Sequence, residues 1–436
     1  MCQTEVLPFN PWVDSMLRQI FPIIALFLST GFLQAGGGVH AILIPVRAQI
    51  EGFSTSYIAL IGTGYAVGFT LGCLVVPLLV RRVGHVRTFG ALSALLATVM
   101  LLNGLIVNPF VWILLRAIAG LCFAGSYMII ESWLNERLSN ENRGSLFSIY
   151  MIVSLVTMML GQYLLVVANP EMQTLFMVGA ILYALAVLPT ALSKAQSPAP
   201  LTRVKFDLIK LFLNSPAAVV CAIVAGVLSG AWANFAPVFA KLSGMSNANI
   251  ANILVFAMIG SIIFQMPIGR LSDMMDRRFV MIGTSFFGAL AGFLLAGVTV
   301  VDGQPDYIFF AGIIIFGGFI YSIYSLAVAH ANDYANPEDF VETSSGLLIL
   351  FGIGSMIGPM AMAPIMDALG PSGLFTGMGA AHILLAAFIL FRVISRALPK
   401  NHETVDFQSV PIGKAQTPET YVLDPRADAE TYGSNE

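Results

Sequence analysis

The residues of this sequence that could do chemistry are ionisable side chains inside long apolar segments. Arg116 and Glu131 lie in one such segment, residues 110–134. An ionisable group at membrane depth costs about 3 kcal/mol or more, so it normally faces the protein interior or a water-filled cavity. Gly120 and Tyr127 lie between them, and spacings of 4, 11 and 15 positions from Arg116 place all four within about 60° on a helix. They therefore form one stripe that could bind a polar ligand.

Both ionisable residues allow two interpretations. Arg116 could attract an anionic or carboxylate-bearing group of a ligand, or its guanidinium could satisfy backbone carbonyls near the edge of the membrane. Glu131 could act as a gate or take up a proton; alternatively, it could form an ion pair with Arg143 or with a basic residue at 81–87. Such an ion pair would still have a mechanistic use, because a contact formed in only one state biases a conformational equilibrium.

Other polar and aromatic residues in apolar segments extend the set of candidates. Three glycines at 36–38 permit close approach of a neighbouring helix or of a ligand. His40 and Arg47 are seven residues apart on one helical face, which fits either a protonation switch or a buried, satisfied histidine. Aromatic residues in these apolar segments could line a mostly apolar binding cavity, pack between helices or lie at the membrane interface. The candidate substrate contacts are Gln34, His40, Arg116, Tyr127, Trp232, Asn234, Tyr321 and Tyr324. The candidates for proton coupling or gating are Glu131, His330 and Asp333.

Chemistry that is missing from these segments limits the function classes. We find no histidine-rich cluster and no paired carboxylates at membrane depth in the sequence, which argues against a membrane-embedded enzyme. The four cysteines lack the spacing of metal ligands, so we expect packing roles for them and neither a metal site nor a cofactor. No soluble domain carries a basic patch, so nucleic acid is not an expected partner.

The segments that must position these residues are long enough to cross a bilayer. The sequence is 57% hydrophobic and 10% charged, and its mean hydropathy is +0.83. Such a chain would expose too much apolar surface in water, so its solvent must be lipid. A membrane-spanning helix needs about 20 apolar residues, whereas barrel strands would be short and alternating. The expected helices are 19–45, 55–80, 88–107, 110–134, 144–167, 172–193, 216–240, 247–268, 279–300, 307–331, 343–365 and 372–393.

Basic residues predict the orientation of these helices. Lys and Arg near helix ends are retained on the cytoplasmic side of a membrane. Of the 21 basic residues, 18 share one side of the expected helices, Arg47 and Lys241 fall on the other, and Arg116 lies within a helix. We therefore expect a multi-pass protein of the inner (plasma) membrane with both termini in the cytoplasm.

The chain divides into two halves of six helices. Similar motifs at 81–87 and 269–278, and at 129–146 and 329–347, are offset by 192 and about 199 residues, which indicates duplicated halves. The expected fold is an all-α membrane protein with two pseudo-symmetric halves. Its parts are a cytoplasmic N-terminal segment (1–18), an N-terminal half (19–193), a cytoplasmic linker (194–215), a C-terminal half (216–393) and a disordered cytoplasmic tail (394–436) with no part in transport.

Two motifs resemble those of a known transporter family. The stretch GRLSDMMDRR at 269–278 resembles the loop signature of the major facilitator superfamily between the second and third helices of a half. Arg116 and Gly120 resemble its Arg-x-x-x-Gly pattern in the fourth helix. With twelve helices and a central polar linker, the resemblance covers residues 15–396 and implies the fold of that superfamily.

The first loop departs from the family pattern. Pro77 stands where glycine is expected and Arg81 where aspartate is expected. This loop, followed by ESWLNER at 131–137, resembles the YcaD-like branch of the superfamily. The resemblance implies that the loops control conformational change and that the first, fourth, seventh and tenth helices line the transport path. The residues assigned to conformational control are Gly84, Arg87, Arg143, Gly269, Asp273, Arg277 and Arg278.

These observations predict a secondary active transporter, a monomer in the lipid bilayer that moves a small solute by alternating access. Arg47, Arg116 and Lys241 favour an organic anion or zwitterion as substrate, and protons are the candidate coupling ion. Efflux of hydrophobic drugs is the alternative, although the fifth helix lacks the Gly-Pro signature of drug–proton antiporters. A membrane-embedded enzyme and a non-transporting receptor are more remote alternatives. The sequence leaves the substrate and the direction of transport undetermined.

Overall fold

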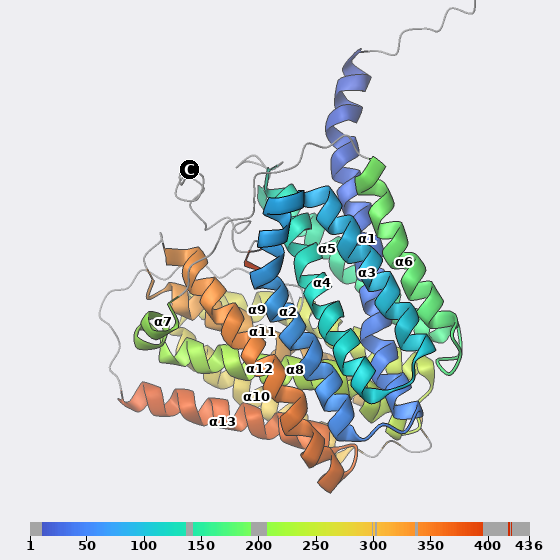
Figure 1. Cartoon of the computed structure of the whole chain (residues 1–436). Helices are drawn as coiled ribbons and strands as arrows, with labels where there is room; N and C mark the ends of the chain where they lie inside the picture. Colours follow the sequence, from blue (N-terminus) through green and yellow to red (C-terminus); the bar gives the residue numbers. More distant parts are fainter. Residues whose placement is uncertain are drawn as a thin grey trace, which may run out of the picture.

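Every long element of the described residues is a helix (Figure 1). The computed structural model describes residues 11–136, 143–192, 207–298, 300, 303–335, 339–395, 417, 418 and 420, and within them the side chains other than those of 11–23 and 143–145. Twelve helices in these ranges are long and apolar enough to cross a membrane. The prediction of an all-α membrane protein with twelve such helices is confirmed.

The helices follow the predicted order. The first half contains α1 (Pro11–Ile50), α2 (Thr55–Val83), α3 (His85–Leu105), α4 (Pro109–Glu136), α5 (Arg143–Tyr163), the short 3-10 helix η1 (Leu164–Val166) and α6 (Thr174–Leu192). The second half contains α8 (Pro216–Leu242), α9 (Asn247–Met274), α10 (Arg277–Gly297), α11 (Tyr307–Asn332), α12 (Phe340–Leu369) and α13 (Gly373–Ser395). Several helices, α9 and α12 among them, extend past their predicted ends, because hydropathy marks only the apolar part of a helix that continues into polar residues.

A short helix that the sequence did not predict lies in the linker between the halves. Helix α7 (Leu208–Asn214) begins where the side chain of Asp207 accepts hydrogen bonds from two backbone N–H groups of its first turn. Lys210 of α7 forms an ion pair of 2.9 Å with Asp339, just before α12. The hydrogen bond that Lys210 donates to the Asp339 carboxylate, together with the negative charge of that group, raises the pKa of Lys210. The linker therefore docks on the second half.

Glycines let helix backbones meet in the same way in both halves. Gly68 of α2 lies against the backbone of α4, and Gly120 of α4 lies against the backbone of α2. A Cβ at either position would overlap a backbone carbonyl of the other helix. Gly260 of α9 and Gly317 of α11 make the equivalent approach in the second half. Gly260 follows Gly68 by 192 positions, which is the offset of the loop motifs. Small residues permit this close packing where lipid provides no hydrophobic drive for helix association.

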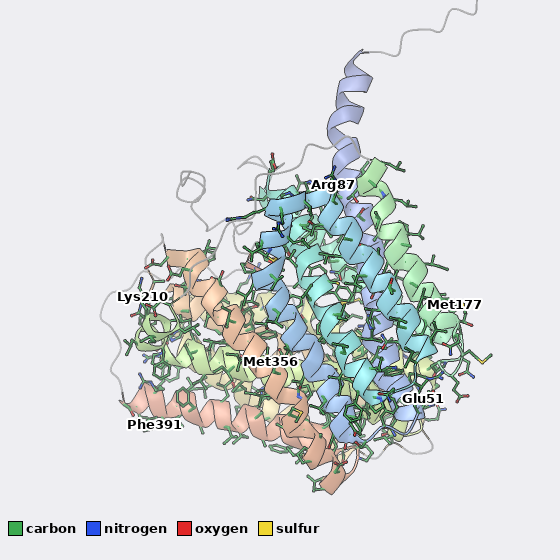
Figure 2. The ribbon with its side chains drawn as sticks, viewed as in Figure 1. Glu51, Arg87, Met177, Lys210, Met356 and Phe391 are labelled. Atoms are coloured by element: carbon green, nitrogen blue, oxygen red, sulfur yellow. The ribbon has the colours of Figure 1, made fainter. Side chains whose placement is uncertain are left out.

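The outer faces of the helices are apolar, as a lipid solvent requires. Figure 2 shows Met177 of α6 and Phe391 of α13 pointing outward, and their exposed fractions are 53% and 62%. Arg87 and Glu51 mark the two ends of the first half in the same view. We call the end with Arg87 the basic end, because Arg81 and Arg82 also lie there at the close of α2. The other we call the opposite end.

The two halves contact each other toward the opposite end. Thr55, at the start of α2, donates a hydrogen bond of 2.7 Å to Asp367 near the end of α12. About two turns further along α2, the hydroxyl of Thr63 donates a hydrogen bond of 2.8 Å to the backbone carbonyl of Met356 in α12. On the other side of the molecule, the hydroxyl of Tyr163 donates to Asn252 of α9 at 2.6 Å. These contacts close the opposite end.

Candidate functional site

Two neighbouring cavities lie between the halves, and Tyr65 lines both. The larger, of about 340 Å³, lies between α2 and α12 on the basic side of Thr63; its lining is mostly apolar and includes Phe69 and Phe351. We call it the apolar cavity. The smaller, of about 80 Å³, is lined by Arg116 with residues from both halves, and we call it the arginine cavity.

Among the described residues that line the arginine cavity, Arg116 has the only cationic side chain. It is 5% exposed, and its guanidinium carbon lies 4.6 Å from the centroid of the Tyr65 ring. The glycine contact of α2 with α4 brings these two side chains together, because Gly120 of α4 packs on the backbone of Tyr65. Arg116 Nε has no hydrogen-bond partner among the described residues. A buried charge that lacks a counter-ion is costly, so this position suits an anionic group of a ligand.

Further buried polar atoms of the arginine cavity also lack partners within the described part of the chain. They are Trp232 Nε1 and Gln162 Oε1. With Arg116 Nε they offer two donors and one acceptor. Buried polar atoms are normally paired, so the set fits a site whose ligand supplies the missing partners.

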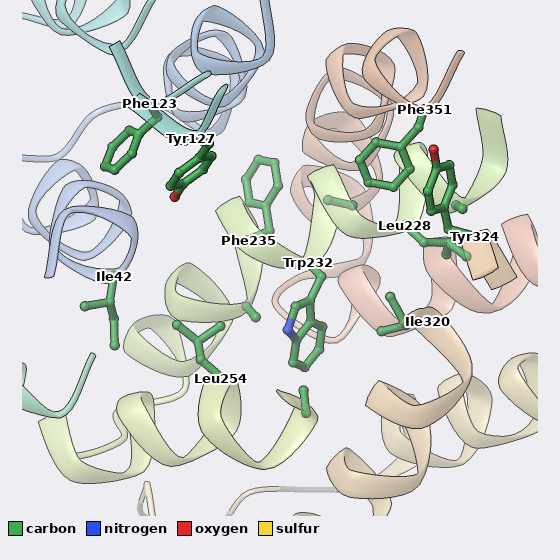
Figure 3. Packing of buried hydrophobic residues seen from close by; sticks show 14 of the residues in the cluster. Ile42, Phe123, Tyr127, Leu228, Trp232, Phe235, Leu254, Ile320, Tyr324 and Phe351 are labelled. Carbon is green, nitrogen blue, oxygen red and sulfur yellow. The ribbon is translucent and has the colours of Figure 1, made fainter. Parts of the chain in front are cut away.

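Aromatic residues from both halves complete the wall of this cavity. Figure 3 shows Phe123 and Tyr127 of α4 across from Trp232 of α8. Tyr127 donates a hydrogen bond of 2.9 Å to Gln34 of α1, and Tyr321 of α11 lines the same cavity. The structure thus brings together five of the eight candidate substrate contacts: Gln34, Arg116, Tyr127, Trp232 and Tyr321.

The other three candidates lie apart from the arginine cavity. Asn234 lines the apolar cavity and donates to the carbonyl of Gly230 at 2.8 Å. Tyr324 packs edge-on against Phe351, with ring centroids 4.9 Å apart, and lines neither cavity. His40 is fully buried outside both cavities, with Nδ1 3.3 Å from the hydroxyl of Tyr183.

The candidates for gating lie toward the basic end. Glu131 is fully buried and accepts a hydrogen bond of 3.2 Å from Tyr150. His330 is also buried, and its ring packs edge-on against that of Tyr334 at 5.1 Å. Asp333 forms an ion pair of 2.7 Å with Arg277. His330 and Asp333 therefore belong to the junction of α10 and α11 rather than to either cavity.

The second loop motif forms a charged junction at the basic end. Arg277, whose side chain is 1% exposed, also pairs with Asp273 at 3.3 Å. Arg278 pairs with Asp276 at 2.9 Å. Burial raises the pKa of Asp276, but hydrogen bonds from the side chain and backbone of Arg278 outweigh that effect and hold the pKa below its usual value. The Gly269 carbonyl accepts a hydrogen bond of 2.7 Å from Ser272.

The first loop motif is more open. Gly84 joins α2 to α3 with a φ of 86°, a conformation that favours glycine. Arg87 is exposed on α3. The side chain of Arg143, at the start of α5, lies outside the described residues.

Sequence reasoning missed three polar residues of the arginine cavity: Tyr65, Ser154 and Gln162. Ser154 and Gln162 are eight residues apart on one face of an apolar helix, which is a signal that could have identified them. Tyr65 carries no such pattern, because its role depends on the approach of α2 to α4. Among the described residues, no group of three or more metal-ligating side chains occurs.

Comparison with known proteins identifies similar chains over most of this length. A sequence profile described as Major Facilitator Superfamily matches residues 26–260 and again 218–421. A protein of Escherichia fergusonii named uncharacterized MFS-type transporter YcaD is 26% identical over 384 residues, which are 87% of this chain and 98% of that protein. The protein of that name in Escherichia coli is 23% identical over 377 residues, 85% of this chain and 95% of that protein.

Solved structures of transporters have the same fold. The nucleoside transporter NupG matches with a TM-score of 0.74 at 13% identity, covering 85% of this chain and 98% of that chain. A bacterial homolog of the human lysosomal transporter Spinster, in an inward-facing and occupied conformation, matches with a TM-score of 0.67 at 15% identity, covering 91% and 99%. At these identities the likeness concerns the fold alone.

Proposed function

Because this chain belongs to the Major Facilitator Superfamily, we propose that it carries an organic acid across the membrane by alternating access, with the acid group bound at Arg116. The resemblance to this family and to its YcaD-like members, inferred from the loop motifs, is confirmed, and the chain is a multi-pass membrane transporter rather than an enzyme. The unpartnered Arg116 Nε in a cavity shared by both halves is the observation that carries the proposal.

The distribution of basic residues supports an inner-membrane orientation in which the basic end faces the cytoplasm. The opposite end, closed by the contacts of Thr55, Thr63 and Tyr163, then faces outward. The structure in this orientation is an inward-facing state, with its larger cavity on the cytoplasmic side of those contacts. Alternating access would require these contacts to break while the basic end closes.

The pairing of a small charged cavity with a larger apolar one supports an amphipathic acid as substrate. A carboxylate at Arg116 would accept hydrogen bonds from the guanidinium and from Trp232. The apolar body of the molecule would extend past Tyr65 into the apolar cavity, where Phe69 and Phe351 line the wall. A zwitterion could add a donor to Gln162 Oε1. Protons are the candidate coupling ion, with Glu131 as their candidate carrier because its carboxyl lies buried within a membrane-spanning helix.

A thermal-shift screen of the detergent-solubilised protein tests this proposal. A ligand at about 100 times its Kd stabilises the folded state by about 2.7 kcal/mol. We expect shifts from amphipathic carboxylates, and Arg116→Met should weaken their binding by about 10- to 100-fold. The ligand-free Arg116→Met protein should unfold at the same temperature or higher, since the variant removes a buried charge that has no ion-pair partner in the described part of the chain.

Tyr324→Phe is the matched control, because Tyr324 lies outside both cavities. This variant should retain the carboxylate shift. Persistence of the shift in Arg116→Met would contradict the assigned role of Arg116. Shifts confined to hydrophobic cations would instead favour drug efflux, an alternative that the mostly apolar lining of the larger cavity supports.

A further inference from the structure

Two residues of the C-terminal tail are buried, and the tail contacts α4 and the apolar cavity. Thr417 and Thr420 are 0% and 3% exposed. The hydroxyl of Thr417 donates a hydrogen bond to the carboxylate of Glu131 in α4, and Pro418 lines the apolar cavity. The sequence predicts no part in transport for this tail, since polar residues in a chain segment do not by themselves predict burial.

Two backbone N–H groups of the buried tail residues are satisfied within the tail. The N–H of Thr417 donates to the hydroxyl of Thr420 at 2.9 Å, and the N–H of Thr420 donates to the carbonyl of Thr417 at 3.0 Å. Pro418 has no N–H to satisfy. A segment can be buried without a large penalty when its polar groups are paired in this way.

These tail residues contact both halves of the molecule. Glu131, the partner of Thr417, belongs to the first half, and the cavity that Pro418 lines is also lined by Ser345 and Leu348 of α12 in the second half. The halves would have to approach each other here for the basic end to close. Tail residues held in this position would obstruct that approach and would also fill space that a ligand needs.

We propose that Thr417, Pro418 and Thr420 belong to a plug that binds at Glu131, closes the apolar cavity and holds the transporter in the state seen here. Transport then requires release of the tail, which frees the mouth of the cavity and exposes the Glu131 carboxyl to water. The inhibitory consequence rests on the proposed alternating-access function. The binding of the plug itself is independent of any substrate and can be tested alone.

The reactivity of Cys73 reports on the plug, because this free cysteine lines the same cavity as Pro418. The full-length chain with Cys2→Ser is compared with a chain that ends at Ala415 and with Thr417→Val. Loss of a hydrogen bond to a charged group shifts an equilibrium by about tenfold or more. Alkylation of Cys73 by N-ethylmaleimide should therefore accelerate about tenfold in Thr417→Val and at least as much in the shortened chain. A synthetic peptide of residues 412–424 should slow it again.

Two controls isolate the effect. Cys73→Ser should abolish the labelling signal. Thr98→Val should leave the rate unchanged, since Thr98 is exposed and its hydroxyl donates to the carbonyl of Ala94 in its own helix. Unchanged alkylation in both tail variants, or a peptide without effect on the shortened chain, would overturn the plug. Faster alkylation with an unchanged transport rate would overturn its inhibitory role while leaving the site at Arg116 untouched.

Discussion

Three buried arginines in this protein have different surroundings. Arg47 pairs with Glu51 and also donates to backbone carbonyls of the loop after η1. Arg277 pairs with Asp333 at 2.7 Å. Arg116 lies against an aromatic face, and its Nε has no partner among the described residues. The first two arginines have acidic partners, whereas Arg116 forms no ion pair among the described residues, which is why we propose it as the anion site.

The two acidic partners of Arg277 should differ in their contributions to stability. Asp333 has a side chain that is 9% exposed, whereas that of Asp273 is 33% exposed and lies 3.3 Å away. Breaking a buried pair costs about 3 kcal/mol or more, and an exposed pair is worth about 1 kcal/mol or less. Asp333→Asn should therefore lower the unfolding temperature clearly more than Asp273→Asn, as measured by thermal unfolding in detergent.

Asp273→Asn should instead act mainly on kinetics, slowing turnover more than it weakens equilibrium binding of substrate. Equal loss of stability in the two variants would show that the Asp333 pair does not hold this junction. Equal loss of turnover and binding in Asp273→Asn would argue against a role of Asp273 in conformational change.

At the scale of elements, equivalent helix junctions are built with different chemistry in the two halves. The start of α10 meets the end of α11 through the ion pair of Arg277 with Asp333. In the first half, the start of α3 meets the end of α4 through His85 Nε2, which lies 3.4 Å from the hydroxyl of Ser132. The first loop motif thus places a histidine and a serine where the second places an arginine and an aspartate.

The close approach of α2 and α4 should tolerate no side chain at Gly68. A Cβ there would overlap the carbonyl of Ala117, and a backbone carbonyl cannot rotate away as a side chain can. Gly68→Ala should destabilise the protein by about 1 to 3 kcal/mol, measured as a lower unfolding temperature. Gly283→Ala in α10 is the matched control, since among the described residues no atom beyond its chain neighbours and the nearby backbone of its own helix lies within 4 Å of a Cβ built at that position. Equal effects of both substitutions would mean that helix propensity rather than packing decides the outcome.

The sequence was sufficient for features that depend on one helix at a time. Hydropathy located the twelve membrane-spanning helices. Helical periodicity predicted that Arg116 and Tyr127 share one face of their helix, and both side chains line the arginine cavity. The role of Tyr65 and the burial of Thr417 could not be predicted, because each depends on the approach of segments far apart in the chain. Helix α7 escaped prediction because a helix of 7 residues has too little periodicity to detect.

At the scale of the whole molecule, the contacts between the halves define one state of a cycle. Thr55 and Asp367 lie at the closed end, with side-chain oxygens 2.7 Å apart. A disulfide between Thr55→Cys and Asp367→Cys, in a chain with its native cysteines replaced, should lock this end and abolish transport. Reduction should restore the rate, which is measured as uptake into proteoliposomes.

The single variants Thr55→Cys and Asp367→Cys are the controls, and an oxidant should leave their transport unchanged. Transport that continues at the full rate through the cross-linked protein would show that this end need not open. The halves would then have to exchange the substrate by a movement other than the one proposed.

The glycine-mediated pairs of α2 with α4 and of α9 with α11 each join helices of the same half. The first of these pairs can form before any helix of the second half has been synthesised. Membrane insertion at the ribosome proceeds from the N-terminus, so the first half can assemble while the second is still being translated. A premature stop codon in the linker should therefore yield a compact six-helix fragment that resists proteases, rather than an unfolded chain that the cell degrades.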